Sequence, residues 1–195
     1  MRDGPASWRG PSRWWDPSTD RPIVRQRLQA TVDTLLDQVA RRGSWVGGGS
    51  AAALTAALAA ALLQKLVVRP TAVRKLRRIR AICLRAVTED ATRFAGVIHA
   101  VRRGDRATFR RTLKVATELQ WSVFQGAQQV QAECRTSQRR VKPRLQSDLL
   151  CAMALALAAS EASRTLILTN VAWLNDASYT QQFRRRLQRA RPARS

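Results

Sequence analysis

Glycine and proline, the residues that most often interrupt helices, are confined in this sequence mainly to the two ends and a few internal breaks. The 195-residue chain has only 9 glycines and 7 prolines. Alanine, leucine, arginine and glutamine dominate the long stretches between them. No run of β-branched residues is bounded by turn signals, as a strand would require. These features predict an all-α fold without a sheet.

Apolar residues recur every three or four positions in several segments, which is the spacing of one helix face. Thr71, Asp105 and Ser178 have side chains that can cap a helix N-terminus. The predicted helices, about six in number, run from Asp20 to Gly43, from Ser50 to Pro70, from Thr71 to Gly104, from Asp105 to Ser137, from Arg144 to Leu174 and from Ser178 towards the C-terminus. Long helices joined by short turns predict an antiparallel bundle.

The chain is short enough to form one hydrophobic core. Residues 1–18 contain glycines, prolines and three tryptophans, and we expect an irregular N-terminal arm there. Trp8, Trp14 and Trp15 either dock on the body or on a partner, or the arm has no fixed structure. Residues 19–188 are predicted to form one helical domain, and residues 189–195 a basic tail.

The charge balance is strongly positive, with 35 Lys and Arg residues against 13 Asp and Glu residues and a net charge of +22. A nucleic acid or another polyanion is one explanation for such an excess. The other explanation is a solvated, arginine-rich surface, because the arginines are spread over several predicted helices. No known base-reading motif is present, so any nucleic-acid binding is expected to be non-specific.

Three cysteines, Cys83, Cys134 and Cys151, lie in helical runs without a CxxC pair, which is typical of a cytoplasmic protein without a disulfide framework. The only histidine is His99, which we place on a solvated face, so we expect no metal site. The N-terminus lacks the apolar segment of a signal peptide. Residues 51–68 are mostly alanine, and we interpret them as a core helix and expect no membrane association.

The segment Gly47-Gly48-Gly49-Ser50 directly precedes the alanine-rich helix. Glycines let a backbone turn sharply and approach a ligand, and a helix N-terminus presents free N–H groups to an anion. A flexible turn with a serine cap is the alternative interpretation. The alanines that follow would allow another helix to pack closely.

Asp90 lies on the apolar stripe of the third predicted helix, with Cys83, Val87, Phe94, Val97 and Val101. A carboxylate on an inward face is costly unless it is paired or functional, and burial would raise its pKa into the range of a general acid or base. The alternative is a buried ion pair with an arginine. Glu89, one position earlier, is expected on the solvated face.

Two further polar residues belong to the fifth predicted helix. Asp148 stands in its first turn, where an acidic residue either interacts with the helix dipole or contributes to chemistry. Asn170 lies on the apolar stripe near the end of this helix, and its amide requires partners on a neighbouring helix or a ligand.

These residues together resemble the cyclodeaminase domain of formiminotransferase-cyclodeaminase and its stand-alone bacterial relatives, some described as methenyltetrahydrofolate cyclohydrolases. The family's glycine-rich turn before an alanine-rich helix matches 47–53. Its mid-chain aspartate motif matches 89–94, its later Ser-Asp matches 147–148, and the second Asn of its Asn-Val-x-x-Asn pattern matches Asn170. The resemblance extends over residues 24–185.

The resemblance implies a helical homodimer that acts on a one-carbon adduct of tetrahydrofolate, without a permanently bound cofactor. The cyclodeaminase closes 5-formiminotetrahydrofolate to 5,10-methenyltetrahydrofolate and releases ammonia, whereas the cyclohydrolase adds water to the methenyl form. Arginines would meet the glutamate tail of the folate. The residues implied are, as catalytic groups, Asp90 and Asp148 and, as substrate-binding groups, Gly47, Gly48, Gly49, Ser50 and Asn170.

Four features differ from the family pattern. After the second predicted helix the family usually has a Gly-Lys-rich stretch, whereas this chain has Val68-Arg69-Pro70-Thr71, and the strong positive charge is not typical of the family. Val46 stands where the family usually has proline, and Leu166 stands where the first asparagine of the pair would be. Two alternatives to a folate enzyme therefore stay open. One is a diverged, non-catalytic protein of the same fold that binds a polyanion such as nucleic acid, and the other is a structural, partner-binding bundle.

Overall fold

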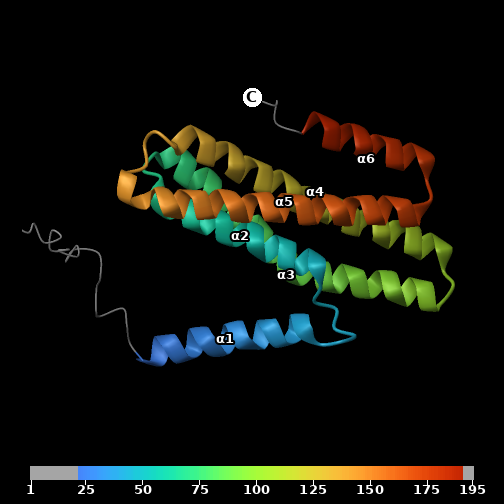
Figure 1. The fold of residues 1–195 in the computed structure, drawn as a ribbon. Coiled ribbons are helices and arrows are strands. Elements are labelled where there is room, and N and C mark those ends of the chain that lie inside the picture. Colours follow the sequence, from blue (N-terminus) through green and yellow to red (C-terminus); the bar gives the residue numbers. More distant parts are fainter. Residues whose placement is uncertain (1–21, 191–195) are drawn as a thin grey trace, which may run out of the picture. The chain divides into compact units, whose positions relative to one another are not determined.

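The computed structural model describes residues 22–190, with side chains from residue 31 onward. These residues form six α-helices and one short 3-10 helix, and this part of the chain contains no strand (Figure 1). The prediction of an all-α fold is therefore confirmed. The arm expected at 1–18 and most of the expected basic tail lie outside the described residues.

The chain divides into two compact units, residues 1–42 and residues 43–195. In the first unit, α1 spans Pro22–Ala40. The second unit begins at Gly43, whose φ is +79°. The second unit contains α2 (Gly48–Leu66), α3 (Pro70–Arg102), α4 (Arg106–Ser137), the 3-10 helix η2 (Pro143–Leu145), α5 (Gln146–Leu174) and α6 (Ala177–Arg189). The second unit holds all the candidate site residues.

Several helix boundaries follow the sequence signals. Gly104 has a φ of +67° just after α3, and the Asp105 carboxylate accepts the Thr108 N–H at 3.0 Å at the start of α4, as predicted. Two predicted boundaries are wrong: Pro70 as the end of the second predicted helix and Ser178 as the cap of the last one. Pro70 is the first residue of α3, where a missing N–H costs nothing. Asp176 is the N-cap of α6 and accepts the Tyr179 N–H at 3.1 Å.

The fifth predicted helix was expected to begin at Arg144. Instead, residues Pro143–Leu145 form η2, and α5 begins at Gln146. The amide of Gln146 donates to the carbonyl oxygens of Gln138 and Val141, at 2.9 Å and 3.0 Å. The polar break between α4 and α5 is thereby tied to the start of α5.

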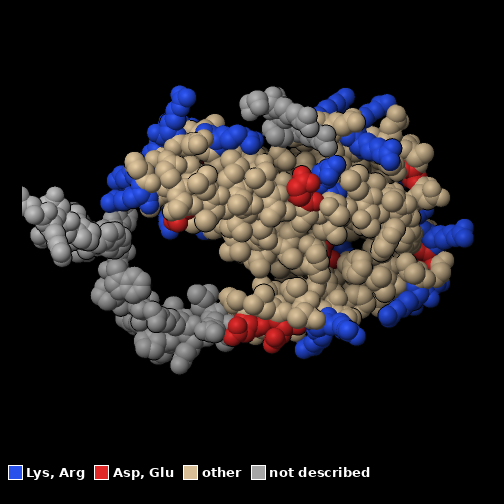
Figure 2. Space-filling model, in the orientation of Figure 1, with Lys and Arg blue, Asp and Glu red and all other residues tan. Residues whose placement is uncertain are grey.

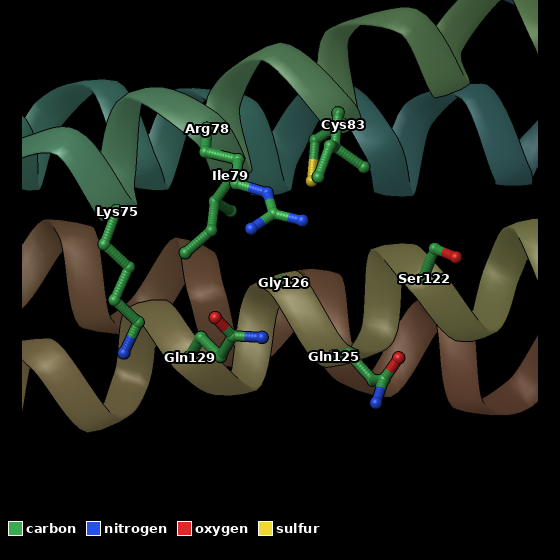
Figure 3. Close-up of a pocket in the computed structure, with 9 residues that line it drawn as sticks. Lys75, Arg78, Ile79, Cys83, Ser122, Gln125, Gly126 and Gln129 are labelled. Carbon is green, nitrogen blue, oxygen red and sulfur yellow. The ribbon is translucent and has the colours of Figure 1, made fainter.

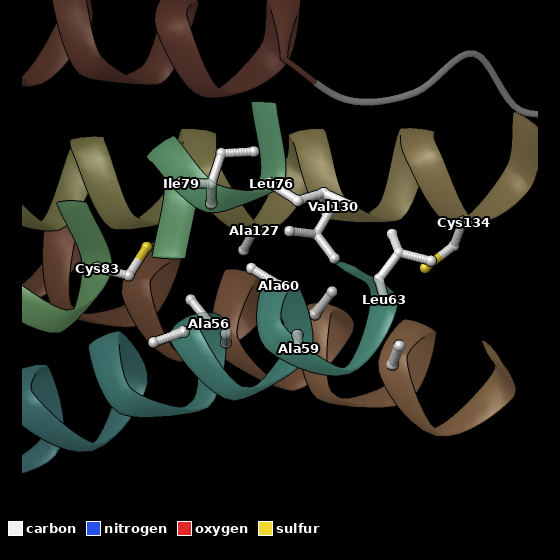
Figure 4. Packing of buried hydrophobic residues seen from close by; sticks show 14 of the residues in the cluster. Ala56, Ala59, Ala60, Leu63, Leu76, Ile79, Cys83, Ala127, Val130 and Cys134 are labelled. Atoms are coloured by element: carbon white, nitrogen blue, oxygen red, sulfur yellow. The ribbon is translucent and has the colours of Figure 1, made fainter. Parts of the chain in front are cut away.

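The core of the second unit is built around α2, which packs against α3, α4 and α5. Ala53, Ala56, Ala59, Ala60 and Leu63 are completely buried. Figure 4 shows four of them, Ala56, Ala59, Ala60 and Leu63, on α2 among the neighbouring helices. The distance between packed helices depends on the side chains at the contact, so a face of alanines allows three neighbours to approach α2 closely. The interpretation of the alanine-rich segment as a core helix is confirmed.

Two contacts fix how α2 lies along α5. At one end, a Cβ atom on Gly48 would lie 3.8 Å from Cδ2 of Leu166. At the other end, Lys65 Nζ lies 2.9 Å from Asp148 Oδ2. The two helices therefore run in opposite directions, with Ser163 of α5 at about the level of Ser50 of α2.

The second half of α3 departs from the predicted inner stripe. Val97 is buried together with Leu113 and Leu174, but Phe94 and Val101 are 38% and 55% exposed. The reason is length. Since α3 is 33 residues long and α2 only 19, α3 continues beyond the start of α2 and has fewer helices to pack against there.

The last helix, α6, is held by an aromatic cluster. Phe183 is fully buried and meets Trp121 edge-on, with ring centroids 6.1 Å apart. The Arg186 guanidinium lies 4.4 Å from the Trp121 ring centroid and donates to both carboxylate oxygens of Glu118, at 2.6 Å and 2.9 Å. A two-point arginine–carboxylate pair over aromatic rings fixes both position and orientation.

By length and composition, two helical stretches would be able to cross a membrane: α2, and the η2–α5 segment from Pro143 to Leu174. In the described structure, 56% of the apolar stretch in α2 and 33% of that in η2–α5 are buried. A buried core helix passes the same test, and α2 lies in the core of the second unit. The apolar surface of α5 is left partly uncovered.

Two leucines on α3 test this packing. Leu76 is completely buried, whereas Leu84 on the same helix is 57% exposed. We expect Leu76→Ala to lower the free energy of unfolding by about 2–5 kcal/mol, because it removes buried methyl groups and leaves a cavity. Leu84→Ala should change it by less than about 0.5 kcal/mol. Urea denaturation followed by circular dichroism measures both, and equal effects would contradict the described core.

Candidate active site

The glycine-rich segment forms the first turn of α2. Gly47 is the N-cap, and Gly48, Gly49 and Ser50 are the first three helical residues. None of these glycines has a positive φ, and Ser50 is not the cap residue. The first N–H groups of a helix have no partner within the helix and carry the positive end of its dipole. This turn therefore presents free donors at the end of a core helix.

Asp90 of α3 lies against this helix end. Its carboxylate accepts the backbone N–H of Ser50, and Ser50 Oγ lies 3.4 Å from Asp90 Oδ2. The Ser50 hydroxyl also donates to the carbonyl oxygen of Val87 at 2.7 Å. From α4, Gln120 Nε2 donates to Asp90 Oδ1 at 2.7 Å. Three helices thus converge on one carboxylate.

The approach of Asp90 explains why position 49 is glycine. A Cβ atom on Gly49 would overlap the Asp90 carboxylate, whereas a Cβ atom on Gly48 would make only an ordinary contact with Leu166 and one on Gly47 would meet open space. Gly49 is buried within α2. The function of this glycine is therefore to give space to a side chain of another helix, and it is not required by a left-handed backbone.

The electrostatics of Asp90 are set mainly by burial. Burial raises the pKa of this carboxyl group above its ordinary value, and the hydrogen bonds from Gln120 and Ser50 oppose that rise. None of the ion pairs within residues 31–190 involves Asp90. The alternative of a structural pair with arginine is therefore not what this structure contains. A half-buried carboxyl group with a raised pKa is suited to exchanging a proton.

Gln120 was not anticipated from the sequence. It is 1% exposed, and its Oε1 atom has no hydrogen-bond partner among the described residues, although its Nε2 atom holds Asp90. A buried amide oxygen without a partner is costly, so it is available to accept a hydrogen bond from a ligand. The signal was present in the sequence: Gln120 is a polar residue on the inner stripe of α4, between Ala116 and Val123.

Ser163 of α5 is a second buried group without a partner. It is completely buried, and its hydroxyl has no hydrogen-bond partner in the described part of the chain. The register of α2 against α5 places it at about the level of Ser50. Unpaired polar atoms thus occur on two helices that line this end of the unit.

Asn170 and Asp148 lie at different distances from this site. Asn170 is half-buried one helical turn beyond Leu166, the residue that contacts the Gly48 position, but no hydrogen bond joins it to Asp90. Asp148 pairs with Lys65, which lies 16 residues after Gly49 on α2, about 24 Å away at the rise of an α-helix. The structure therefore brings together Gly49, Ser50 and Asp90 and leaves Asp148 at the opposite end of α2.

The two residues that were expected to be solvated are exposed. Glu89 pairs with Arg93 on the surface of α3, at 3.3 Å, and the side chain of Glu89 is 46% exposed. His99 is exposed as well. The contrast between Glu89 and Asp90, which are neighbours in sequence, arises because only Asp90 faces α2 and α4.

These observations define the class of the protein. It is an all-helical protein with a half-buried carboxyl group beside a helix that begins with glycines. The sequence profile of formiminotransferase-cyclodeaminase matches residues 31–75 and 68–189, which is most of the chain. The chain belongs to this family. The resemblance drawn from the glycine turn, the mid-chain aspartate and the later Ser-Asp is thereby confirmed.

A solved structure supports the fold. The formiminotetrahydrofolate cyclodeaminase of Thermotoga maritima matches with a TM-score of 0.74 and 20% sequence identity. The match covers 80% of this chain and 85% of that one. A comparison with curated protein sequences gives no match.

Substituting the glycines one at a time tests the close approach of Asp90. We expect Gly49→Ala to lower the free energy of unfolding by about 1–3 kcal/mol, because its methyl group would displace the carboxylate. Gly48→Ala should be neutral or stabilising by up to about 1 kcal/mol, since alanine is the better helix former and the position has room. Thermal and urea unfolding measure both. A Gly49→Ala protein as stable as Gly48→Ala would contradict the described contact.

Proposed function

We propose that this chain is a one-carbon folate enzyme of the cyclodeaminase type, with Asp90 as the proton-transfer residue. The observation that carries the proposal is the Asp90 carboxyl group, held between Ser50 and Gln120 with a raised pKa. A Leu or Val at this inward position would cost less free energy to bury. Membership of the formiminotransferase-cyclodeaminase family supports the choice of substrate.

The proposed reaction needs a group that moves protons. In 5-formiminotetrahydrofolate, N10 attacks the formimino carbon and closes the five-membered ring. The proton of N10 and one further proton reach the former imino nitrogen, the carbon–nitrogen bond breaks, and ammonia leaves as 5,10-methenyltetrahydrofolate forms. Asp90 in its neutral form donates a proton to the departing nitrogen, and its carboxylate form accepts one from N10. Positioned acid–base catalysis of this kind contributes roughly 10²–10⁴ in rate.

The other residues of the site are assigned to binding. In the turn formed by Gly47, Gly48, Gly49 and Ser50, the N–H groups that Asp90 does not take up would donate hydrogen bonds to electron-rich atoms of the pterin. The unpartnered Oε1 atom of Gln120 is an acceptor for an N–H group of the ligand. Asn170 would orient the substrate from α5, and surface arginines would meet the glutamate tail. Asp148 lies at the opposite end of α2 from Asp90. A catalytic role for it would require a second chain to bring it close to the folate.

The methenyltetrahydrofolate cyclohydrolase reaction is the second activity to test. It requires the same proton transfers, with water attacking the methenyl carbon in place of ring closure. The same assay distinguishes the two, because one releases ammonia from the formimino substrate and the other consumes the methenyl form. We place the cyclodeaminase first because the structural neighbour bears that name.

An Asp90→Asn substitution separates the catalytic role from a structural one. We expect turnover of 5-formiminotetrahydrofolate, followed through ammonia release, to fall by roughly 10²–10⁴ because asparagine cannot carry the proton. Glu89→Gln is the matched control, since it removes an exposed carboxylate one position away, and it should keep the parent's turnover. The Asp90→Asn variant should remain folded, because an asparagine side chain can still accept a hydrogen bond from the Ser50 N–H.

The pH dependence of stability supplies an independent readout. Burial raises the pKa of Asp90 in the folded state, so the folded protein retains a proton that the unfolded chain releases. The parent therefore loses stability as pH rises above the ordinary carboxyl range. The melting temperature of Asp90→Asn minus that of the parent should increase from acid to neutral pH. Unchanged turnover in this variant, or no turnover of either folate by the parent, would overturn the proposal.

We propose also that the enzyme is a homodimer joined through α2 and α5. Leu58, Leu150 and Leu157 are 52%, 64% and 47% exposed. From Gly48 to Gln64, and again from Leu149 to Ser160, neither helix has a charged residue. Figure 2 shows an uncharged surface over α2 and the first part of α5, bordered by basic groups and, near the middle of α5, by an acidic group. A contiguous apolar surface of this kind marks an association site.

The dimer is tested by its mass in solution. We expect light scattering at micromolar concentration to give twice the chain mass of 21.8 kDa. Leu157→Glu should reduce the mass to that of one chain, because it buries an unpaired charge in the interface. Leu84→Glu, at an exposed leucine of α3, is the matched control and should leave the dimer intact. A monomeric parent protein would refute the assembly.

A further inference from the structure

The first half of α3 carries a dense group of cations. It has six basic residues within twelve positions and no acidic residue until Glu89; they are Arg74, Lys75, Arg77, Arg78, Arg80 and Arg85. All six are exposed, and none forms an ion pair among the described residues. Elsewhere, Arg69, Arg110 and Arg186 pair with carboxylates. The cationic segment of α3, residues 74–85, is therefore left uncompensated by the protein itself.

A cavity of about 310 Å³ lies between this segment and α4. Lys75 and Arg78 reach from α3 towards α4, where Gln125 and Gln129 lie across the gap (Figure 3). The floor is apolar, with Ile79, Cys83 and Gly126, and Ser122 adds a hydroxyl group. No carboxylate lines the cavity. Cationic and neutral hydrogen-bonding groups without acidic ones are suited to an oxyanion.

A second cavity, of about 330 Å³, adjoins the first. Gln125 and Gln129 line both, so they form a ridge between the two. The second cavity extends past Gln128 to Arg135 and to Ala190 at the end of α6. The two hollows lie on either side of this ridge and together form a strip of surface that is wider than a single small anion would need, so a chain of repeated charges fits it better.

The residues that line this strip also indicate how such a chain would bind. Proteins that hold single-stranded nucleic acid present exposed aromatic rings on which bases stack. The only aromatic residue in either lining is Phe124, which is 2% exposed. Its buried ring offers no surface for a base. Contacts to phosphates carry no sequence information but supply much of the affinity for a duplex.

We propose that the strip formed by the cationic segment of α3 and the glutamines of α4 binds the phosphate backbone of a nucleic-acid duplex without sequence preference. Lys75 and Arg78 contact phosphates, and Gln125 and Gln129 donate hydrogen bonds to phosphate oxygens. The folate site at Asp90 is separate from this function. Because each contact releases condensed counterions, binding weakens steeply with salt.

Fluorescence anisotropy with the full chain and a mixed-sequence DNA duplex of about 20 base pairs, two helical turns, tests the proposal. The test variant is Lys75→Gln/Arg78→Gln. The control is Arg102→Gln/Arg103→Gln, which removes the same charge at the C-terminal end of α3. Arg102 is 24 residues beyond Arg78, or about 36 Å away. Circular dichroism confirms that both variants remain helical.

We expect the Lys75→Gln/Arg78→Gln variant to weaken binding at least about tenfold at low salt. It should also reduce the slope of log affinity against log salt by about 2, which is one unit for each lost phosphate contact. The control variant should weaken binding less than about threefold. Asp90→Asn should bind like the parent, which separates this function from folate chemistry. Duplexes of unrelated sequence should bind equally well.

Three results would overturn the proposal. An equal loss of affinity in the Lys75→Gln/Arg78→Gln variant and in the control variant would mean that net charge alone attracts the duplex. Poly-glutamate that displaces the duplex at the same charge concentration would mean that the strip is a site for acidic peptides. A parent protein that does not bind the duplex at low salt would remove the function altogether.

Discussion

The smallness of the residues on α2 is the constraint on which the second unit depends. Ala53, Ala56, Ala59 and Ala60 are completely buried, and they allow α3, α4 and α5 to pack around one helix. The same principle continues to the first turn, where Gly49 leaves space for the Asp90 carboxylate. A larger side chain at any of these positions would push a neighbouring helix away, and the carboxylate would lose the Ser50 and Gln120 donors.

Charge is divided between the surfaces of this unit according to which helices form them. The charge-free stretches of α2 and α5 carry exposed leucines and suit a partner of the same kind. The first half of α3 and the second half of α6 carry arginines. Arg186 of α6 pairs with Glu118 and lies over the aromatic cluster. The cations of α3 have no such partner. The proposed dimer and the proposed duplex contact therefore use different faces of this unit.

Much of the fold was predictable because helix signals are local. The periodic apolar residues, the Gly104 stop and the Asp105 cap act within one or two turns. Predictions failed where two local signals competed or where a distant element decided. Pro70 signals both a stop and a start, and Asp176 outcompeted Ser178 as the cap because its carboxylate reaches the Tyr179 N–H. Phe94 and Val101 fit the stripe but lie beyond the helices that would cover them.

The sequence by itself determined the helices, the family and the candidate residues Gly49, Ser50 and Asp90, since spacing along a helix fixes which side chains share a face. The tertiary structure alone decided which of these residues meet. It brought Gln120 to Asp90 from a different helix, and it placed Asp148 with Lys65 at the far end of α2. A sequence pattern records the direction of each side chain around its own helix axis, whereas the register between helices follows from packing many side chains at once.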